Sequence, residues 1–161
     1  MVVVGGRGAG GPAGDAWALD LAAGAWRPLA EAAVTPRFGH RAALGSDGAL
    51  YVVGGAVQGR GLSRDVWRCR DLLSGGACED ISLGCPERHY DAAPFQPASM
   101  PLAYHHALAA AGGSLYMWGG AAADDVPAAG LFRFDVATCT WEEVPQPGAP
   151  PPRRGDAAAQ G

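Results

Sequence analysis

The chain has 161 residues, about the size of one ordinary domain, and 48% of them are hydrophobic, which is enough to build a core. The formal net charge is −4, so the broad basic field of a nucleic-acid-binding protein is missing. No apolar run approaches the roughly 18 residues that cross a bilayer, and the N-terminus lacks a secretion signal, so we expect neither a nucleic-acid nor a membrane partner.

The first predicted element is an apolar run at the N-terminus that ends in two glycines, MVVVGG (1–6). The same pattern returns in LYVVGG (50–55) and in LYMWGG (115–120). A pattern that recurs in phase indicates an internal repeat, here with a period of about 50 residues and one insertion of about 15.

A longer alignment supports the second and third copies. HRAALGSDGALYVVGG (40–55) aligns without a gap on HHALAAAGGSLYMWGG (105–120), which places His40 over His105. We therefore interpret His105 as structural. Neighbours on a strand point to opposite faces, so His105 and His106 are not expected to bind one metal ion.

An aromatic residue and a closing tryptophan follow the glycine pairs. DAWALDLAAGAWRPL (15–29) aligns with GLFRFDVATCTWEEV (130–144), whereas DVWRCRDLLSGGACEDI (65–81) has one extra residue and carries Cys78 where the tryptophan should be. Aromatic and β-branched runs between turn residues favour strands. Each unit is thus predicted to have four strands, of which the first runs from about 37 to 44 in the second unit and the second ends in the glycines.

Such a unit cannot bury both of its faces alone, and packing copies face to face around an axis produces a β-propeller. The glycines would allow φ values that other residues avoid and the close approach of a neighbouring backbone, while the aromatic residues would pack between blades. The residues that define the repeat are Gly5, Gly6, Trp17, Trp26, Gly54, Gly55, Trp67, Gly119, Gly120, Phe132 and Trp141.

At these residues the sequence resembles the kelch repeat family, over nearly the whole chain apart from about 83–100. The resemblance implies an all-β, kelch-type β-propeller, usually of about six blades, that presents loops to a protein partner and holds no cofactor. Cys78 departs from the pattern, as does Gly130, where the other units have Asp15 and Asp65.

The propeller is predicted to be incomplete. We expect a partial blade without its first strand at 1–30, a second blade with a degenerate end at 36–82, an inserted loop at 83–100, a third blade at 101–145, and a Pro-rich connector with the first strand of a next blade at 146–161. PRRGDAA (152–158) repeats PRFGHRA (36–42), so residues 153–159 are a candidate to complete the first blade. Propellers typically need roughly four to eight blades, which predicts a fragment, the favoured alternative, or half of a six-blade dimer.

Binding of a protein partner is expected through the loops near 56–64, 83–100 and 121–129. One candidate is an arginine cluster that engages the carboxylates of an acidic partner, or else forms a solvated blade edge: Arg60, Arg64, Arg68 and Arg70. Strand alternation puts Arg68 and Arg70 on the face opposite Trp67 and Cys69. The insertion offers Tyr90 and Phe95 as anchors, or is a tolerated loop.

The alternative function is a metal-dependent enzyme on the same scaffold. Galactose oxidase is similar to kelch proteins in fold and uses a copper centre with tyrosine and histidine ligands. No nucleophile motif is recognisable here, and the cysteine spacings match no paired zinc arrangement. We therefore predict no catalytic or metal-binding residue.

The cysteines leave the compartment open. Cys69, Cys78, Cys85 and Cys139 permit two disulfides, with a small Cys78–Cys85 loop as one alternative and idle or buried thiols as the favoured one. Without a signal peptide, the cytoplasm is slightly favoured.

Overall fold

The computed structural model describes residues 1–31, 33–84, 104–121, 127 and 130–148. Within these residues the chain consists of β-strands and two short 3-10 turns, η1 (Leu72–Ser74) and η2 (Ile81–Gly84). No helix in this described part is long and apolar enough to span a membrane. The all-β prediction is confirmed.

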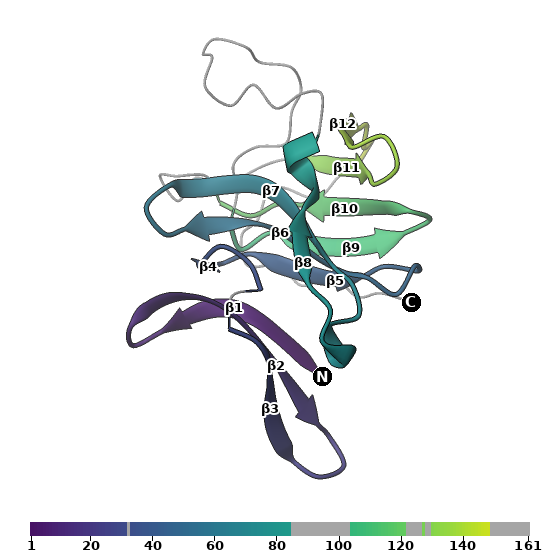
Figure 1. The fold of residues 1–161 in the computed structure, drawn as a ribbon. Coiled ribbons are helices and arrows are strands. Elements are labelled where there is room, and N and C mark those ends of the chain that lie inside the picture. The colour runs from purple at the N-terminus through teal and green to yellow at the C-terminus, as the bar shows by residue number, and fades with distance from the viewer. Residues whose placement is uncertain (32, 85–103, 122–126, 128–129, 149–161) are drawn as a thin grey trace.

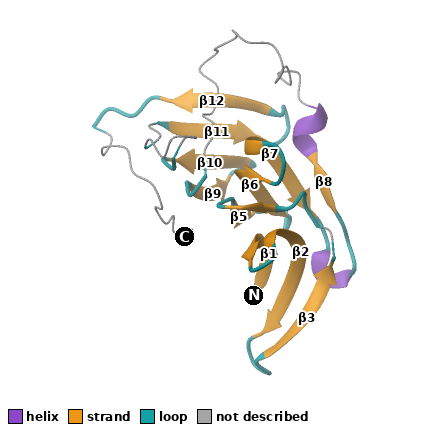
Figure 2. Ribbon diagram, turned by 90° about the vertical axis from the view of Figure 1, so that its left-hand side faces the viewer, coloured by secondary structure: helices purple, strands orange, loops and turns teal. Residues whose placement is uncertain are grey.

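The strands form three blade-like sheets that lie one above another (Figures 1 and 2). The first blade contains β1 (Val2–Gly8), β2 (Gly11–Asp20) and β3 (Ala25–Ala30). The second contains β4 (Arg37–Phe38), β5 (Arg41–Leu44), β6 (Leu50–Val57), β7 (Gly61–Cys69) and β8 (Cys78–Asp80). The third contains β9 (Ala107–Ala111), β10 (Ser114–Trp118), β11 (Leu131–Asp135) and β12 (Thr140–Val144). Because the second blade lies between the other two, the arrangement is an incomplete propeller.

Each blade is an antiparallel sheet whose strands pair in chain order, from β9 to β12 in the third blade and from β5 to β8 in the second. The core lies between the blades. Alternate residues of β6 point to opposite faces, so Val52 packs toward the first blade, whereas Tyr51 and Val53 pack toward the third. Because its side chains alternate between the two faces, β6 contributes residues to both inter-blade cores.

The glycine pair does not end the second strand of the first two blades, so that prediction is wrong there. β6 continues through Gly54 and Gly55 to Val57 with a shift of register between Val53 and Gly55, which is a β-bulge. Gly55 has a φ of 88°, and a Cβ on it would lie 2.7 Å from the Phe38 carbonyl oxygen. The expected roles of the glycines, positive φ and close backbone approach, are confirmed at this position.

The predicted first strand from about 37 to 44 is divided in two. Gly39 has a φ of 69° and separates β4 from β5. β4 pairs with β6 on one side and with β2 on the other, through Ala13 opposite Arg37. It thereby joins the first and second blades into one eight-stranded sheet.

The repeat alignment around the histidines is wrong by one residue. His106, not His105, occupies the position of His40, because Arg41 pairs with Val53 just as Ala107 pairs with Trp118. Each of these partners directly precedes a glycine pair. The left-handed φ of 69° at Gly39 accordingly recurs at His105, with a φ of 57°. Arg41 and Val53 are 12 positions apart, whereas Ala107 and Trp118 are 11 apart, so the hairpin of the third blade is one residue shorter. An ungapped alignment cannot detect this deletion.

His40 joins the first two blades, and this contact predicts a pH dependence. Its Nε2 lies 2.8 Å from the Val4 carbonyl oxygen. Burial lowers the pKa of His40 more than the hydrogen bond to Val4 raises it, and the charges of Arg37 and Arg41 lower it further. Below the ordinary histidine pKa of about 6.5, the unfolded chain therefore takes up the proton before the native state does.

Stability should fall as the pH decreases from 7 to 5, by at most about 1.4 kcal/mol per pH unit from this one group. In the variant His40→Gln, which keeps an NH donor but does not titrate, urea unfolding at pH 7, 6 and 5 should show a smaller decrease. The other histidines are common to both proteins. Equal pH dependence in the variant and the parent would contradict the assignment to His40.

Candidate functional site

The four candidate arginines do not form one cluster in the structure. Arg60 lies in the turn between β6 and β7 and is exposed, and Arg64 is half-buried in β7. Arg68 lies near the far end of β7 and Arg70 just beyond it. At about 3.3 Å per residue, the strand separates Arg60 from Arg68 by about 26 Å. One protein surface patch therefore includes Arg60 and Arg64, and another includes Arg68 and Arg70.

Arg68 and Arg70 share an acidic neighbour on the adjacent strand. The Arg68 Nε and Nη2 atoms donate hydrogen bonds to Glu79 Oε1 at 2.9 and 2.6 Å, and Arg70 Nη1 lies 3.7 Å from the same oxygen. The hydrogen bond from Arg68 lowers the pKa of Glu79. Exposed ion pairs of this kind contribute little stability, but they offset the positive charge at this end of β7.

The remaining predicted binding residues lie largely outside the described part of the chain. Tyr90 and Phe95 are both outside it, as is most of the insertion at 83–100. Of the loop at 121–129, the structure describes only Ala121 and Pro127, which form an isolated β-bridge. These candidates stay predictions.

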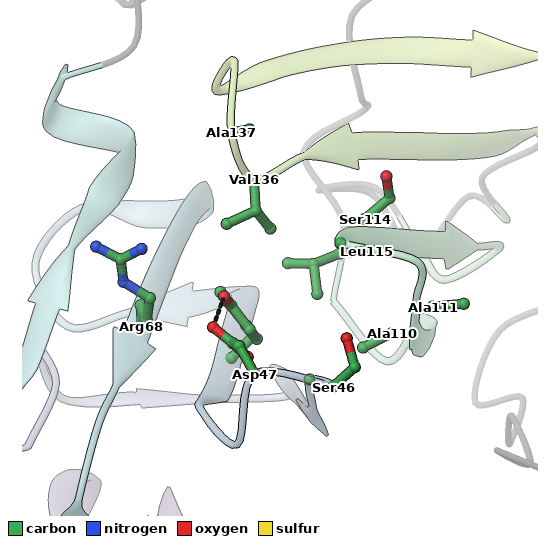
Figure 3. Close-up of a pocket in the computed structure, with 12 residues that line it drawn as sticks. Ser46, Asp47, Arg68, Ala110, Ala111, Ser114, Leu115, Val136 and Ala137 are labelled. Carbon is green, nitrogen blue, oxygen red and sulfur yellow. Dashed lines mark hydrogen bonds between the residues drawn. The ribbon is translucent and has the colours of Figure 1, made fainter.

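A cavity of about 240 Å³ opens between the second and third blades (Figure 3). It lies at the end where β6 and β10 begin, opposite to the turn that carries Arg60. Its apolar wall includes Leu115 and Val136, and its polar edge includes Asp47, Ser46 and Arg68. The sequence pattern did not indicate this cavity, because its wall combines residues from two different repeat units.

The polar edge of the cavity carries a fixed charge. The Tyr51 hydroxyl donates a hydrogen bond to Asp47 Oδ2 at 2.9 Å. Burial raises the pKa of Asp47, but hydrogen bonds from Tyr51 and Ala49 outweigh it and lower that pKa overall. Burial also raises the pKa of Tyr51. Asp47 is thus ionised and Tyr51 neutral at pH 7, and the pair places a negative charge at the polar edge of the cavity.

Metal-binding geometry does not occur in the part of the chain that the structure describes. There, no three His, Cys, Asp or Glu side chains come close enough to hold a metal ion.

The sequence pattern did not single out Arg37, the most deeply buried cation of the residues that the structure describes. Its side chain is fully buried, and its Nη1 and Nη2 atoms donate to Asp65 Oδ1 and Oδ2 at 2.5 and 2.6 Å. Further hydrogen bonds reach the carbonyl oxygens of Thr35 and Gly54, and the guanidinium carbon lies 5.6 Å from the centre of the Trp67 ring. Each of the three guanidinium nitrogens therefore donates at least one hydrogen bond.

Asp65 has a place in the repeat. It accepts a hydrogen bond from Trp67 Nε1 at 2.9 Å, as Asp15 does from Trp17 Nε1 at 2.6 Å. Burial raises the pKa of Asp65, but the hydrogen bonds and charge of Arg37 outweigh it, so the carboxyl stays ionised. The shared spacing of aspartate and tryptophan was the signal that could have identified this ion pair.

Cys69 and Cys78 form a disulfide between β7 and β8, so the interpretations of Cys78 as an idle thiol or a partner of Cys85 are wrong. The two cysteines are directly opposite each other in the sheet. Leu19–Trp26 and Phe134–Trp141 are the equivalent cross-strand pairs of the first and third blades. Cys78 therefore replaces the closing tryptophan by a covalent link. Cys139 is also disulfide-bonded.

Comparison with known proteins agrees with this architecture. No family model matches the chain. The chain is 30% identical over 160 residues to the mouse (Mus musculus) protein named Rab9 effector protein with kelch motifs. The alignment covers 96% of this chain, which spans 38% of the length of that relative. The chain is therefore similar, across its three blades, to part of a protein with kelch motifs.

Proposed function

We propose that this chain is part of a kelch propeller that binds a protein partner through the turns at one end of its blades. The observation that carries the proposal is the basic surface formed by the exposed Arg7 and Arg60 and the half-buried Arg64, here called the turn surface. Arg7 precedes the turn between β1 and β2, and Arg60 lies in the equivalent turn of the second blade. In each blade this turn joins the second strand to the third.

The two turns are close because β4 lies between them. Ala13 pairs with Arg37, and Arg37 pairs with Val57, so only one strand separates the first blade from β6 at this end. Neighbouring strands are about 4.8 Å apart, which places Ala13 of β2 and Val57 of β6, each at the base of its turn, about 10 Å from each other. The Arg7 guanidinium lies 5.0 Å from the centre of the Phe38 ring of β4. A rigid sheet thus supports the basic side chains.

An acidic protein is the partner that this surface favours, because guanidinium groups bind carboxylates with two parallel hydrogen bonds. The mouse relative is named as an effector of Rab9, which makes Rab9 a first candidate partner for this chain. An interaction role without catalysis is consistent with that name. We also propose that the chain self-associates to complete a propeller ring.

Replacing Arg60 and Arg64 together with glutamate should weaken binding to purified Rab9 at least about tenfold, because attraction to carboxylates becomes repulsion. Biolayer interferometry at low and moderate salt measures the affinity, and the difference should shrink with salt. The matched control is Arg27→Glu with Arg70→Glu, which changes the same charge at the opposite end. An equal loss in the control would place the contact elsewhere, and absence of binding by the parent chain would reject Rab9.

A further inference from the structure

One face of the first blade is apolar and exposed. Val3 is 41% exposed, Trp17 39% and Trp26 51%, and Met1 lies beside them at 59%. Val3 is directly opposite Trp17 on β1 and β2, and Trp26 on β3 is opposite Leu19. These four exposed side chains, here called the blade-1 face, form a continuous patch across all three strands. Patches of this kind mark interaction sites.

The repeat shows what covers the equivalent face in the other blades. Val52 and Met117 occupy the position of Val3, and both are fully buried. Phe132, which occupies the position of Trp17, is 6% exposed. In both cases the covering surface belongs to the preceding blade, as the two hydrophobic clusters show. The blade-1 face therefore has the chemistry of a surface that packs against a further blade.

We propose that the blade-1 face binds the third blade of a second copy of this chain, which deepens and rests on the proposed self-association. Leu115 and Met117 of β10 pack toward the second blade, so Tyr116 and Trp118 point to the other side. They occupy the positions of Tyr51 and Val53, the residues with which the second blade covers the third. The chain thus carries both halves of one inter-blade contact, and two copies make a ring of about six blades.

An unpaired strand edge in the first blade supports the same contact between two copies. The second strands β6 and β10 pair with a strand on each side, whereas among the described residues β1 pairs with β2 alone. A free edge can accept an extended segment through backbone hydrogen bonds. The sequence PRRG at 152–155 repeats PRFG at 36–39, and residues 149–161 lie outside the described part of the chain. In the second copy this segment is the occupant that we assign to the edge.

A charge pair specifies the register of that segment. Arg153 occupies the repeat position of Arg37, whose guanidinium binds Asp65. The equivalent of Asp65 in the first blade is Asp15, which has a hydrogen bond from Trp17 and no ion pair within the described residues. Arg153 of the second copy then binds Asp15 as Arg37 binds Asp65.

The face is tested by the molar mass of the full chain, measured by size-exclusion chromatography with light scattering over a hundredfold range of concentration. The parent of 16.4 kDa should run as a dimer, and Val3→Glu and Trp26→Glu should each raise the dissociation constant at least tenfold. Leu44→Glu is the matched control, because Leu44 is 60% exposed and lies outside the face. A monomeric parent overturns self-association, while a dimer that Val3→Glu and Trp26→Glu leave intact overturns the face alone.

The charge pair is tested by exchange between copies. Asp15→Arg and Arg153→Asp should each weaken the dimer, because like charges meet at both contacts. A mixture of the two variants should form a heterodimer in which opposite charges meet at both contacts. If the mixed variants stay as monomeric as each alone, the proposed pair is wrong. Arg60→Glu with Arg64→Glu should leave the dimer intact, which separates this result from the loop-binding function.

Discussion

Replacing Arg37 with methionine should lower the free energy of unfolding by about 3 to 5 kcal/mol, the usual cost of removing one partner of a buried ion pair. Arg37 is fully buried, and its loss would leave the Asp65 carboxylate with only 15% of its side chain exposed. The carbonyl oxygens of Thr35 and Gly54 would also lose their donors. Urea denaturation, followed by tryptophan fluorescence, measures the change.

The double variant Arg37→Met with Asp65→Asn should lose less stability than Arg37→Met alone. Asparagine is neutral, so no unpaired charge remains, and its carbonyl oxygen can still accept the hydrogen bond from Trp67 Nε1. Arg60→Met, at an exposed turn, is the matched control and should change stability by less than about 0.5 kcal/mol. A loss below about 1 kcal/mol for Arg37→Met would show that the ion pair does not secure the fold.

Removing the Cys69–Cys78 disulfide should lower the free energy of unfolding by about 2 to 3 kcal/mol. The two cysteines are separated by nine positions, and closing a loop of that size in the unfolded chain has an entropic cost of about this size. β8 has only three residues, so few backbone hydrogen bonds hold it to β7 without the disulfide. The variant Cys69→Ala with Cys78→Ala removes both thiols and avoids mispairing.

Hydrogen exchange locates the effect of that variant. Amides of β8 should exchange faster, while those of β11 and β12 should change little, because the third blade closes with Phe134 and Trp141, whose ring centres lie 5.0 Å apart. Cys69→Leu with Cys78→Trp imitates the first blade, which has Leu19 opposite Trp26, and should recover part of the loss. Unchanged stability and exchange in the alanine variant would mean that the backbone alone holds β8.

The strands of the blades could be predicted because their signals are local. Paired glycines, an aromatic residue and a closing tryptophan recur in phase, and each depends on residues close in sequence. The limits of this reasoning appear at Gly54 and Gly55, where the strand continues through a bulge. A side chain at Gly55 would collide with the approaching backbone of Phe38 and His40, and this close approach is a long-range contact. The sequence likewise could not show that His106, and not His105, corresponds to His40, because this depends on the pairing register of β9 with β10.

The candidate surfaces were less predictable than the strands. Arg60, Arg64, Arg68 and Arg70 are close in sequence, but an extended strand separates them, and Glu79 from another strand offsets the charge of Arg68. The cavity beside Asp47 also requires two blades to be packed. Charge clusters and cavities depend on which strands become neighbours, and residue types alone do not specify this.

The sequence by itself determined the all-β class, the three blades and the apolar residues at their faces, because strand periodicity and the repeat act locally. The tertiary structure decided which of those faces are covered. Val52 and Met117 are buried and Val3 is exposed at the same repeat position, because burial depends on a neighbouring blade. It also decided the partners of Arg37 and Cys78, since an ion pair and a disulfide each require two strands to be brought together.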